Sequence, residues 1–194
     1  MFTLDTHTHI MPKVMPDFSK KFGYGEFVHL EHHMTGKAWM MQGSKKFREI
    51  EENCWDAHVR IEQMKEHQVD MQLLCTIPVL FNYWAEAKHG LETSQFLNDD
   101  LAATINEHPD KFAGLCTVPL QNVSMAIKEL ERCMMNGYKG VQIGSNVNNI
   151  NLGEKQFEEF WAACESLNAA ILVHPWQMMG QENMAKYWLP WLVG

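Results

Sequence analysis

The sequence has few of the features that mark membrane, secreted or nucleic-acid-binding proteins. No run approaches the roughly 18 consecutive apolar residues of a transmembrane helix. Lys and Arg number 16 against 24 Asp and Glu, so the net charge is −8 and no basic surplus is left for phosphates or anionic lipids. The N-terminus lacks the basic and apolar segments of a signal peptide. We therefore expect a cytoplasmic protein with no nucleic-acid or membrane partner.

Cysteine is also scarce, and its spacing is uninformative for metal binding. The five cysteines are odd in number and form no CxxC pair. They are expected to be reduced, mostly buried thiols rather than disulfides or zinc ligands. With 194 residues and 46% hydrophobic content, the chain is predicted to be one globular domain, spanning 1–194.

Short apolar segments alternate with amphipathic ones along most of the chain. Five segments have the length and flanking residues of buried parallel strands: Phe2–His7, Val69–Thr76, Phe112–Val118, Gly140–Ile143 and Ala169–Val173. Four segments have helical spacing: Trp55–His67, Leu91–His108, Val123–Met135 and Gln156–Leu167. This order predicts an α/β fold with a parallel sheet and right-handed crossovers.

Residues 10–53 interrupt this alternation. They are rich in Lys, His, Met and Gly, and we interpret them as a small, antiparallel cap subdomain inserted after the first strand. Loops that follow strands build the active face of a β/α barrel. Five strands fall short of the eight in a (β/α)8 TIM barrel. The sequence is therefore compatible with an open sheet or with the front part of a longer barrel.

Three histidines follow predicted strands in a pattern that suits a metal ion. His7 and His9 are two residues apart, so they point to the same side of a strand. His174 comes directly after the apolar run Ala169–Val173. The carboxyl ends of barrel strands carry the active site, and neutral imidazole is a common ligand of Zn²⁺. The other seven histidines lie mostly in polar stretches and are expected at the solvated surface; His32 and His33 are adjacent and would face opposite ways.

Several segments carry a resemblance to a known family. Asp5–Pro12 (DTHTHIMP) resembles the strand-one metal signature of the amidohydrolase superfamily, and the likeness extends to its aminocarboxymuconate-semialdehyde decarboxylases. The further matching segments are Phe22–Gly25, His32–His33, Glu52–Asp56, Asn98–Ala102, Gly140–Gly144, Val173–Trp176 and Met184–Gly194. They occur in order along the whole chain.

The resemblance implies a TIM-barrel decarboxylase with one Zn²⁺ per chain. His7, His9 and His174 would be metal ligands, and Arg48, preceded by Phe47, would bind a substrate carboxylate. Trp176, Met178 and Trp191 would line the substrate pocket. The implied reaction is the non-oxidative decarboxylation of 2-amino-3-carboxymuconate 6-semialdehyde to 2-aminomuconate 6-semialdehyde in the kynurenine pathway of tryptophan catabolism. The implied assembly is a homodimer when the enzyme is full length.

The family pattern also contains an aspartate ligand and an assisting histidine on later strands. These are expected beyond Gly194, so the chain is expected to be incomplete at its C-terminus and inactive on its own. Two alternatives stay open. One is a different decarboxylase or hydratase of the same superfamily, and the other is a non-catalytic short form that binds a full-length partner.

Overall fold

A computed structural model describes residues 1–184, 186 and 189 of the chain. Its central feature is a parallel sheet of five strands in the order β1-β5-β6-β7-β10. The strands are β1 (Leu4–His9), β5 (Met71–Cys75), β6 (Phe112–Cys116), β7 (Gly140–Gly144) and β10 (Ala170–His174). The predicted α/β alternation is confirmed. The first strand starts and ends later than expected, so that it includes His9.

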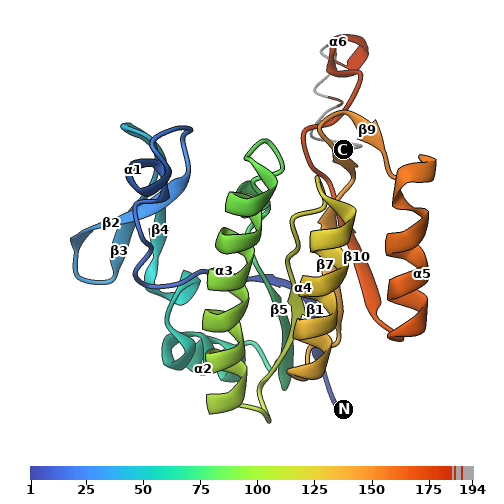
Figure 1. The fold of residues 1–194 in the computed structure, drawn as a ribbon. Helices are drawn as coiled ribbons and strands as arrows, with labels where there is room; N and C mark the ends of the chain where they lie inside the picture. The colour runs from blue at the N-terminus through green and yellow to red at the C-terminus, as the bar shows by residue number, and fades with distance from the viewer. Residues whose placement is uncertain (185, 187–188, 190–194) are drawn as a thin grey trace.

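Four main helices connect these strands, and Figure 1 shows α3, α4 and α5 side by side along one face of the sheet. The helices are α2 (Ala57–Glu66), α3 (Ala87–Glu107), α4 (Val123–Met135) and α5 (Glu158–Ser166). Asp56 caps α2 by accepting hydrogen bonds from the backbone N–H groups of His58 and Val59. Shorter elements are η1 (Glu52–Cys54), η2 (Pro78–Leu80), β8 (Asn146–Val147), β9 (Ile150–Asn151), η3 (Lys155–Phe157) and α6 (Gln181–Met184).

The main core lies between the sheet and these helices. Val141 and Ile143 of β7 are fully buried there, together with Leu130 of α4 and Phe160 of α5. The residue between the two β7 side chains, Gln142, faces the opposite side, because side chains alternate along a strand. Residues paired in register between parallel strands share a face, so the inner face of the sheet carries Gln142 beside Leu172 of β10, with His174 beside Gly144.

The segment between β1 and α2 forms a separate antiparallel layer, at the left of Figure 1. It contains α1 (Phe18–Phe22) and the sheet β2-β3-β4, made of β2 (Val28–Met34), β3 (Lys37–Gln42) and β4 (Lys45–Glu51). Buried Ala38, Met40 and Ile50 join Leu80 and Leu97 in a second apolar cluster. This packing fixes β4 against the loop that follows β5. The subdomain boundaries 10–53 stay a prediction.

The predicted burial of most cysteines is confirmed, and the histidine prediction is partly wrong. All five cysteines are free thiols, four of them buried and Cys54 half-buried. His29, His89 and His108 were expected at the surface, yet their side chains are only 21%, 17% and 18% exposed. Imidazole has an apolar body, and packing against neighbouring elements buries it. Within the described part of the chain, no helix is both long enough and apolar enough to cross a membrane.

Candidate metal centre

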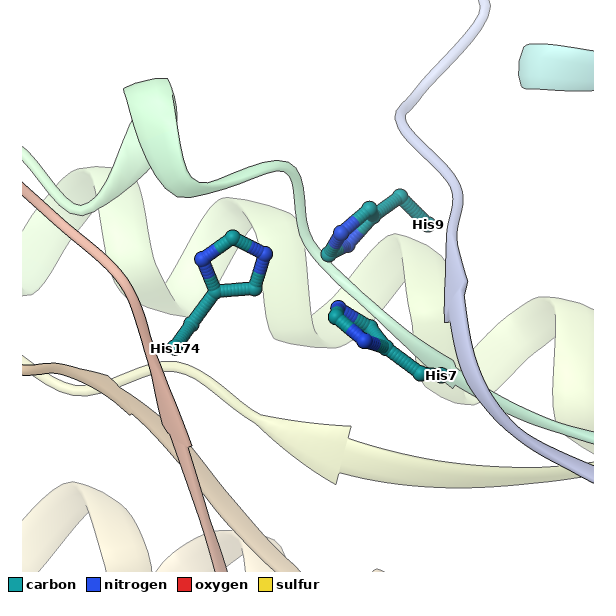
Figure 2. Close-up of side chains that lie close together, drawn as sticks. All are labelled: His7, His9 and His174. Carbon is teal, nitrogen blue, oxygen red and sulfur yellow. The ribbon is translucent and has the colours of Figure 1, made fainter. Parts of the chain in front are cut away.

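Three imidazole rings meet at the carboxyl ends of β1 and β10, as Figure 2 shows. The ring centroids of His7 and His9 are 5.0 Å apart, those of His7 and His174 are 4.9 Å apart, and those of His9 and His174 are 5.2 Å apart. One nitrogen from each ring lies within 4.8 Å of the other two. The structure therefore brings together the three histidines that the sequence singled out.

A β-bulge in β1 helps to aim its two histidines. Asp5 pairs with Gln72 and Thr8 pairs with Leu74, so Thr6 and His7 together stand opposite one residue of β5. A bulge of this kind bends the strand and redirects a side chain, and bulges are common beside active sites. His7 and His9 consequently point toward His174 from the same side (Figure 2).

Main-chain carbonyl groups orient two of the three rings. The Nδ1 atom of His9 lies 3.0 Å from the carbonyl oxygen of Thr76, and the Nδ1 atom of His174 lies 2.8 Å from that of Pro175. A carbonyl oxygen only accepts hydrogen bonds, so each Nδ1 carries the proton and donates. The Nε2 lone pair of each ring is then free to bind a cation, which is the arrangement usual for metal-binding histidines.

Burial keeps two of these rings neutral. The pKa of His9 is lowered to about 4, first by burial and then by the nearby His174 and His7. Burial likewise lowers the pKa of His174. Loss of hydration disfavours the charged imidazolium form. Near neutral pH both rings are therefore in the unprotonated form that binds metals.

Arg60 of α2 holds the backbone of His9 in place through a hydrogen bond to its carbonyl oxygen. This role was not predicted from the sequence. Its Nη2 donates to the carbonyl oxygens of His9 at 2.6 Å and of Asn53 at 2.8 Å, and its Nη1 donates to Oε1 of Gln72 at 3.2 Å. Burial lowers the pKa of Arg60. The sequence does contain one indication of this role. Arg60 precedes the buried Met64 by one helical turn, so a charged residue falls on the apolar face of α2.

A cavity of about 710 Å³ opens beside the rings of His9 and His174. This volume lies within the range typical of small-molecule sites. The predicted residues that line it are His9, His174, Phe47, Arg48, Trp176 and Met178. Strand β4 of the cap and the segment after β10 therefore both line the cavity next to the histidines. Trp191, also predicted to line the pocket, lies outside the described residues.

Two residues of the cavity wall differ in how they are held: hydrogen bonds fix the backbone of Trp176, whereas the guanidinium of Arg48 is exposed. The backbone N–H of Trp176 donates to Oγ of Ser145, and its carbonyl accepts from Nδ2 of Asn146 at 2.7 Å. Its ring meets that of Phe81 edge to face, with centroids 5.7 Å apart. Arg48 is exposed on β4, and no carboxylate within the described residues forms an ion pair with it. Its planar fork is free to bind a ligand carboxylate.

These residues fit a divalent transition-metal ion. Three imidazole nitrogens, two of them oriented by carbonyl groups, match the three-ligand protein set of catalytic zinc sites, which leaves further positions for other ligands. Nitrogen ligands suit zinc and neighbouring first-row metals better than they suit Ca²⁺ or Mg²⁺.

Comparison with known proteins identifies the family of the chain. The profile of the family described as Amidohydrolase matches residues 4–187. The chain belongs to the amidohydrolase family. Two amidohydrolase relatives are named 2-amino-3-carboxymuconate-6-semialdehyde decarboxylase. The one from Dictyostelium discoideum is 47% identical over 98% of this chain, and the one from Caenorhabditis elegans is 34% identical over 98%. The chain covers 54% and 60% of these relatives, so it spans little more than half their length.

A solved amidohydrolase-type structure shows the same fold. A dihydroxybenzoic acid decarboxylase from Polaromonas, solved with bound manganese and an inhibitor, superimposes with a TM-score of 0.71 at 18% identity. The alignment covers all of this chain and 55% of that protein. The amidohydrolase chain described here therefore has an α/β fold of the TIM-barrel type.

Proposed function

We propose that this protein is a metal-dependent, non-oxidative decarboxylase of the cytoplasm that converts 2-amino-3-carboxymuconate 6-semialdehyde to 2-aminomuconate 6-semialdehyde. The observation that carries the proposal is the convergence of His9, His174 and the unpaired Arg48 on one cavity. Two relatives with this activity in their names, at 47% and 34% identity, support the choice of substrate. The reaction breaks a C–CO₂⁻ bond, releases CO₂ and forms a C–H bond with one proton taken up from water, so it needs neither an oxidant nor an organic cofactor.

The proposed cofactor is one Zn²⁺ per chain, held by His7, His9 and His174. When bound, such a cation supplies positive charge and makes hydroxide available near neutral pH. The Nε2 atoms of His9 and His174 are free to bind the cation, because their Nδ1–H groups donate hydrogen bonds to the carbonyl oxygens of Thr76 and Pro175. Manganese in the Polaromonas structure makes Mn²⁺ the competing ion. Imidazole ligands favour Zn²⁺ over Mn²⁺, which supports zinc.

The chain's own side chains would bind and orient a planar, negatively charged substrate. Arg48 would hold one carboxylate through two parallel hydrogen bonds, which fixes the direction of the molecule as well as its position. Phe47 and Trp176 line the same cavity and offer flat apolar surfaces to a conjugated carbon chain. These walls exclude water, and a drier site strengthens the attraction between Arg48 and the carboxylate.

The experiment that tests the proposal combines metal analysis with turnover. The purified full-length protein should hold one zinc at the centre formed by His7, His9 and His174, and it should remove the near-ultraviolet absorbance of the substrate. His174→Ala should lose the zinc of this three-histidine centre and the turnover. His67→Ala is the matched control, because His67 is an exposed histidine at the end of α2. A His174→Ala protein with full zinc and full turnover would refute the assignment.

A second candidate is decarboxylation of an aromatic acid by the same centre. The structural likeness to a dihydroxybenzoic acid decarboxylase favours it, since an aromatic acid is also planar and carboxylated. A substrate panel separates the two candidates. The first requires that the muconate semialdehyde be consumed with the higher kcat/KM and that this reaction depend on Arg48. Preference for a hydroxybenzoate would establish the second.

A further inference from the structure

A second group of metal-ligating side chains lies on the helices, apart from the strand-end histidines. His58 is in the first turn of α2, Glu107 is the last residue of α3, and His108 follows it as the helix cap. One ligand atom from each residue lies within 4.8 Å of the other two. The group shares no residue with His7, His9 and His174. It consists of two imidazoles and one carboxylate, a donor set used in zinc proteins.

The distances are close to those of a metal coordination shell. The Nε2 atoms of His58 and His108 each lie 3.9 Å from Oε1 of Glu107. The two rings are edge to face, with centroids 5.0 Å apart and planes at 84°. In a tetrahedral site with Zn–N bonds of about 2.0–2.1 Å, ligand atoms are about 3.3 Å apart. Small shifts of the exposed His58 and Glu107 side chains would bring these two distances to the tetrahedral spacing.

The buried nitrogen of His108 is an independent indication of a ligand. Its Nε2 atom is inaccessible to solvent and has no hydrogen-bond partner within the described structure. The ring is held against Phe112, at a centroid distance of 6.0 Å. A buried polar atom without a partner is costly, typically by about 1–3 kcal/mol. A cation between His108, His58 and Glu107 would satisfy that atom.

The carboxyl end of α3 also favours a cation. The last carbonyl groups of α3 lie beside Glu107 and His108, and the carboxyl end of a helix carries partial negative charge. Glu107 adds a full negative charge. His58 is exposed, so a cation could enter from solvent without any rearrangement of the core.

We propose that His58, Glu107 and His108 form a second site for Zn²⁺ or a similar imidazole-preferring ion. The bound ion would tie the start of α2 to the end of α3, the two helices that precede the neighbouring strands β5 and β6. Its role would be structural, because the ligands lie on helices and do not line the cavity beside His174. This inference does not depend on the proposed decarboxylase activity.

Counting zinc ions tests the proposal directly. The protein is stripped with a chelator, and zinc is then titrated and counted at equilibrium by elemental analysis. We expect two zinc ions per chain for the wild type and one for both His58→Ala and Glu107→Gln. His67→Ala, the exposed histidine control on the same helix, should keep two. An equal zinc count in the wild type and in His58→Ala would overturn the proposal, whether or not the His7, His9 and His174 centre is loaded.

Thermal unfolding supplies a second readout that separates the two sites. In His174→Ala, zinc should still raise the Tm, because an ion that binds the native state stabilises it. In the double variant His174→Ala/His58→Ala, the zinc-dependent rise should disappear, while far-ultraviolet circular dichroism shows a folded protein. An equal rise in both variants would refute the second site even if the first site and its activity are intact. Loss of activity with an intact second equivalent would instead count against the proposed function alone.

Discussion

The imidazole rings of His7 and His174 are 4.9 Å apart, although their strands are the two opposite edges of the five-stranded sheet. Neighbouring strands are about 4.8 Å apart, so four spacings in a flat sheet would separate β1 and β10 by roughly 19 Å. Two imidazole side chains cannot bridge that gap. The sheet must therefore curl, as the wall of a barrel does, and the metal centre depends on this curvature.

Pairing of β10 with β7 should be critical, because β10 carries His174. A Cβ atom on Gly140 would lie 1.9 Å from the carbonyl oxygen of Ala170, which is its partner in β10. Gly140→Ala should therefore separate the two strands and lower the free energy of unfolding by roughly 2–4 kcal/mol. The number of zinc ions bound per chain should also fall, because β10 carries His174. Gly153→Ala is the control, since a Cβ there makes only an ordinary contact at 3.4 Å. Urea unfolding that shows equal stability for both variants would contradict the prediction.

Arg60 should matter for both stability and metal binding. It donates hydrogen bonds to the carbonyl oxygens of His9 and Asn53 and to Gln72. Arg60→Met keeps the length of the side chain but leaves these acceptors without their donor. The free energy of unfolding should fall by about 2–4 kcal/mol, and zinc affinity should fall because the backbone of His9 is no longer held.

Chemical denaturation and a zinc titration measure the two effects of Arg60→Met. Arg60→Lys should recover only part of the loss, since an ammonium group cannot reach three acceptors in fixed directions. Unchanged stability in Arg60→Met would show that Arg60 does not support the site.

Arg48 should bind the substrate without supporting the fold. Arg48→Ala should lower kcat/KM by about 10- to 100-fold, the equivalent of one charge-assisted, bidentate contact. Most of the change should appear in KM, with the Tm unchanged, because Arg48 is exposed. Lys46→Ala is the control on the same strand, since its ammonium lies over the Trp39 ring, 4.6 Å from the centroid. Equal losses in the two variants would exclude a specific role for Arg48.

The metal-free protein should lose stability in mild acid because of His9. The pKa of His9 is about 4 in the folded protein and 6.5 ordinarily. Between these values the unfolded chain binds a proton that the folded chain does not, so acidification favours unfolding. The contribution is fully present above pH 6.5 and is lost as the pH falls toward 4. After a discount for solvent screening it should amount to about 1–2 kcal/mol. The lowered pKa of His174 acts in the same direction.

Urea unfolding of the chelator-treated protein at several pH values between 7.5 and 4.5 measures this dependence. His9→Gln removes the titrating group, so its stability should change less over the same range. An identical pH dependence in the wild type and in His9→Gln would show that His9 does not cause it.

Local patterns were sufficient to predict much of this architecture. The strand that ends at His174 could be recognised from its apolar run, and α2 from the helical spacing within Trp55–His67. Both features depend on residues close together in the chain, where backbone geometry is repetitive. Arg60 and His108 could not be assigned in this way, because their roles depend on partners from other elements.

The sequence by itself identified the ligands of the strand-end metal centre: an HxH pair in one strand and a lone histidine at the end of another, with period-two alternation that directs His7 and His9 toward one face. Only the tertiary structure decided that these rings meet. It curls the sheet, supplies the Thr76 and Pro175 carbonyl groups, and places Arg48 of the cap beside them. The reason is physical: strand periodicity is set by local covalent geometry, whereas the approach of two sheet edges depends on the packing of the whole domain.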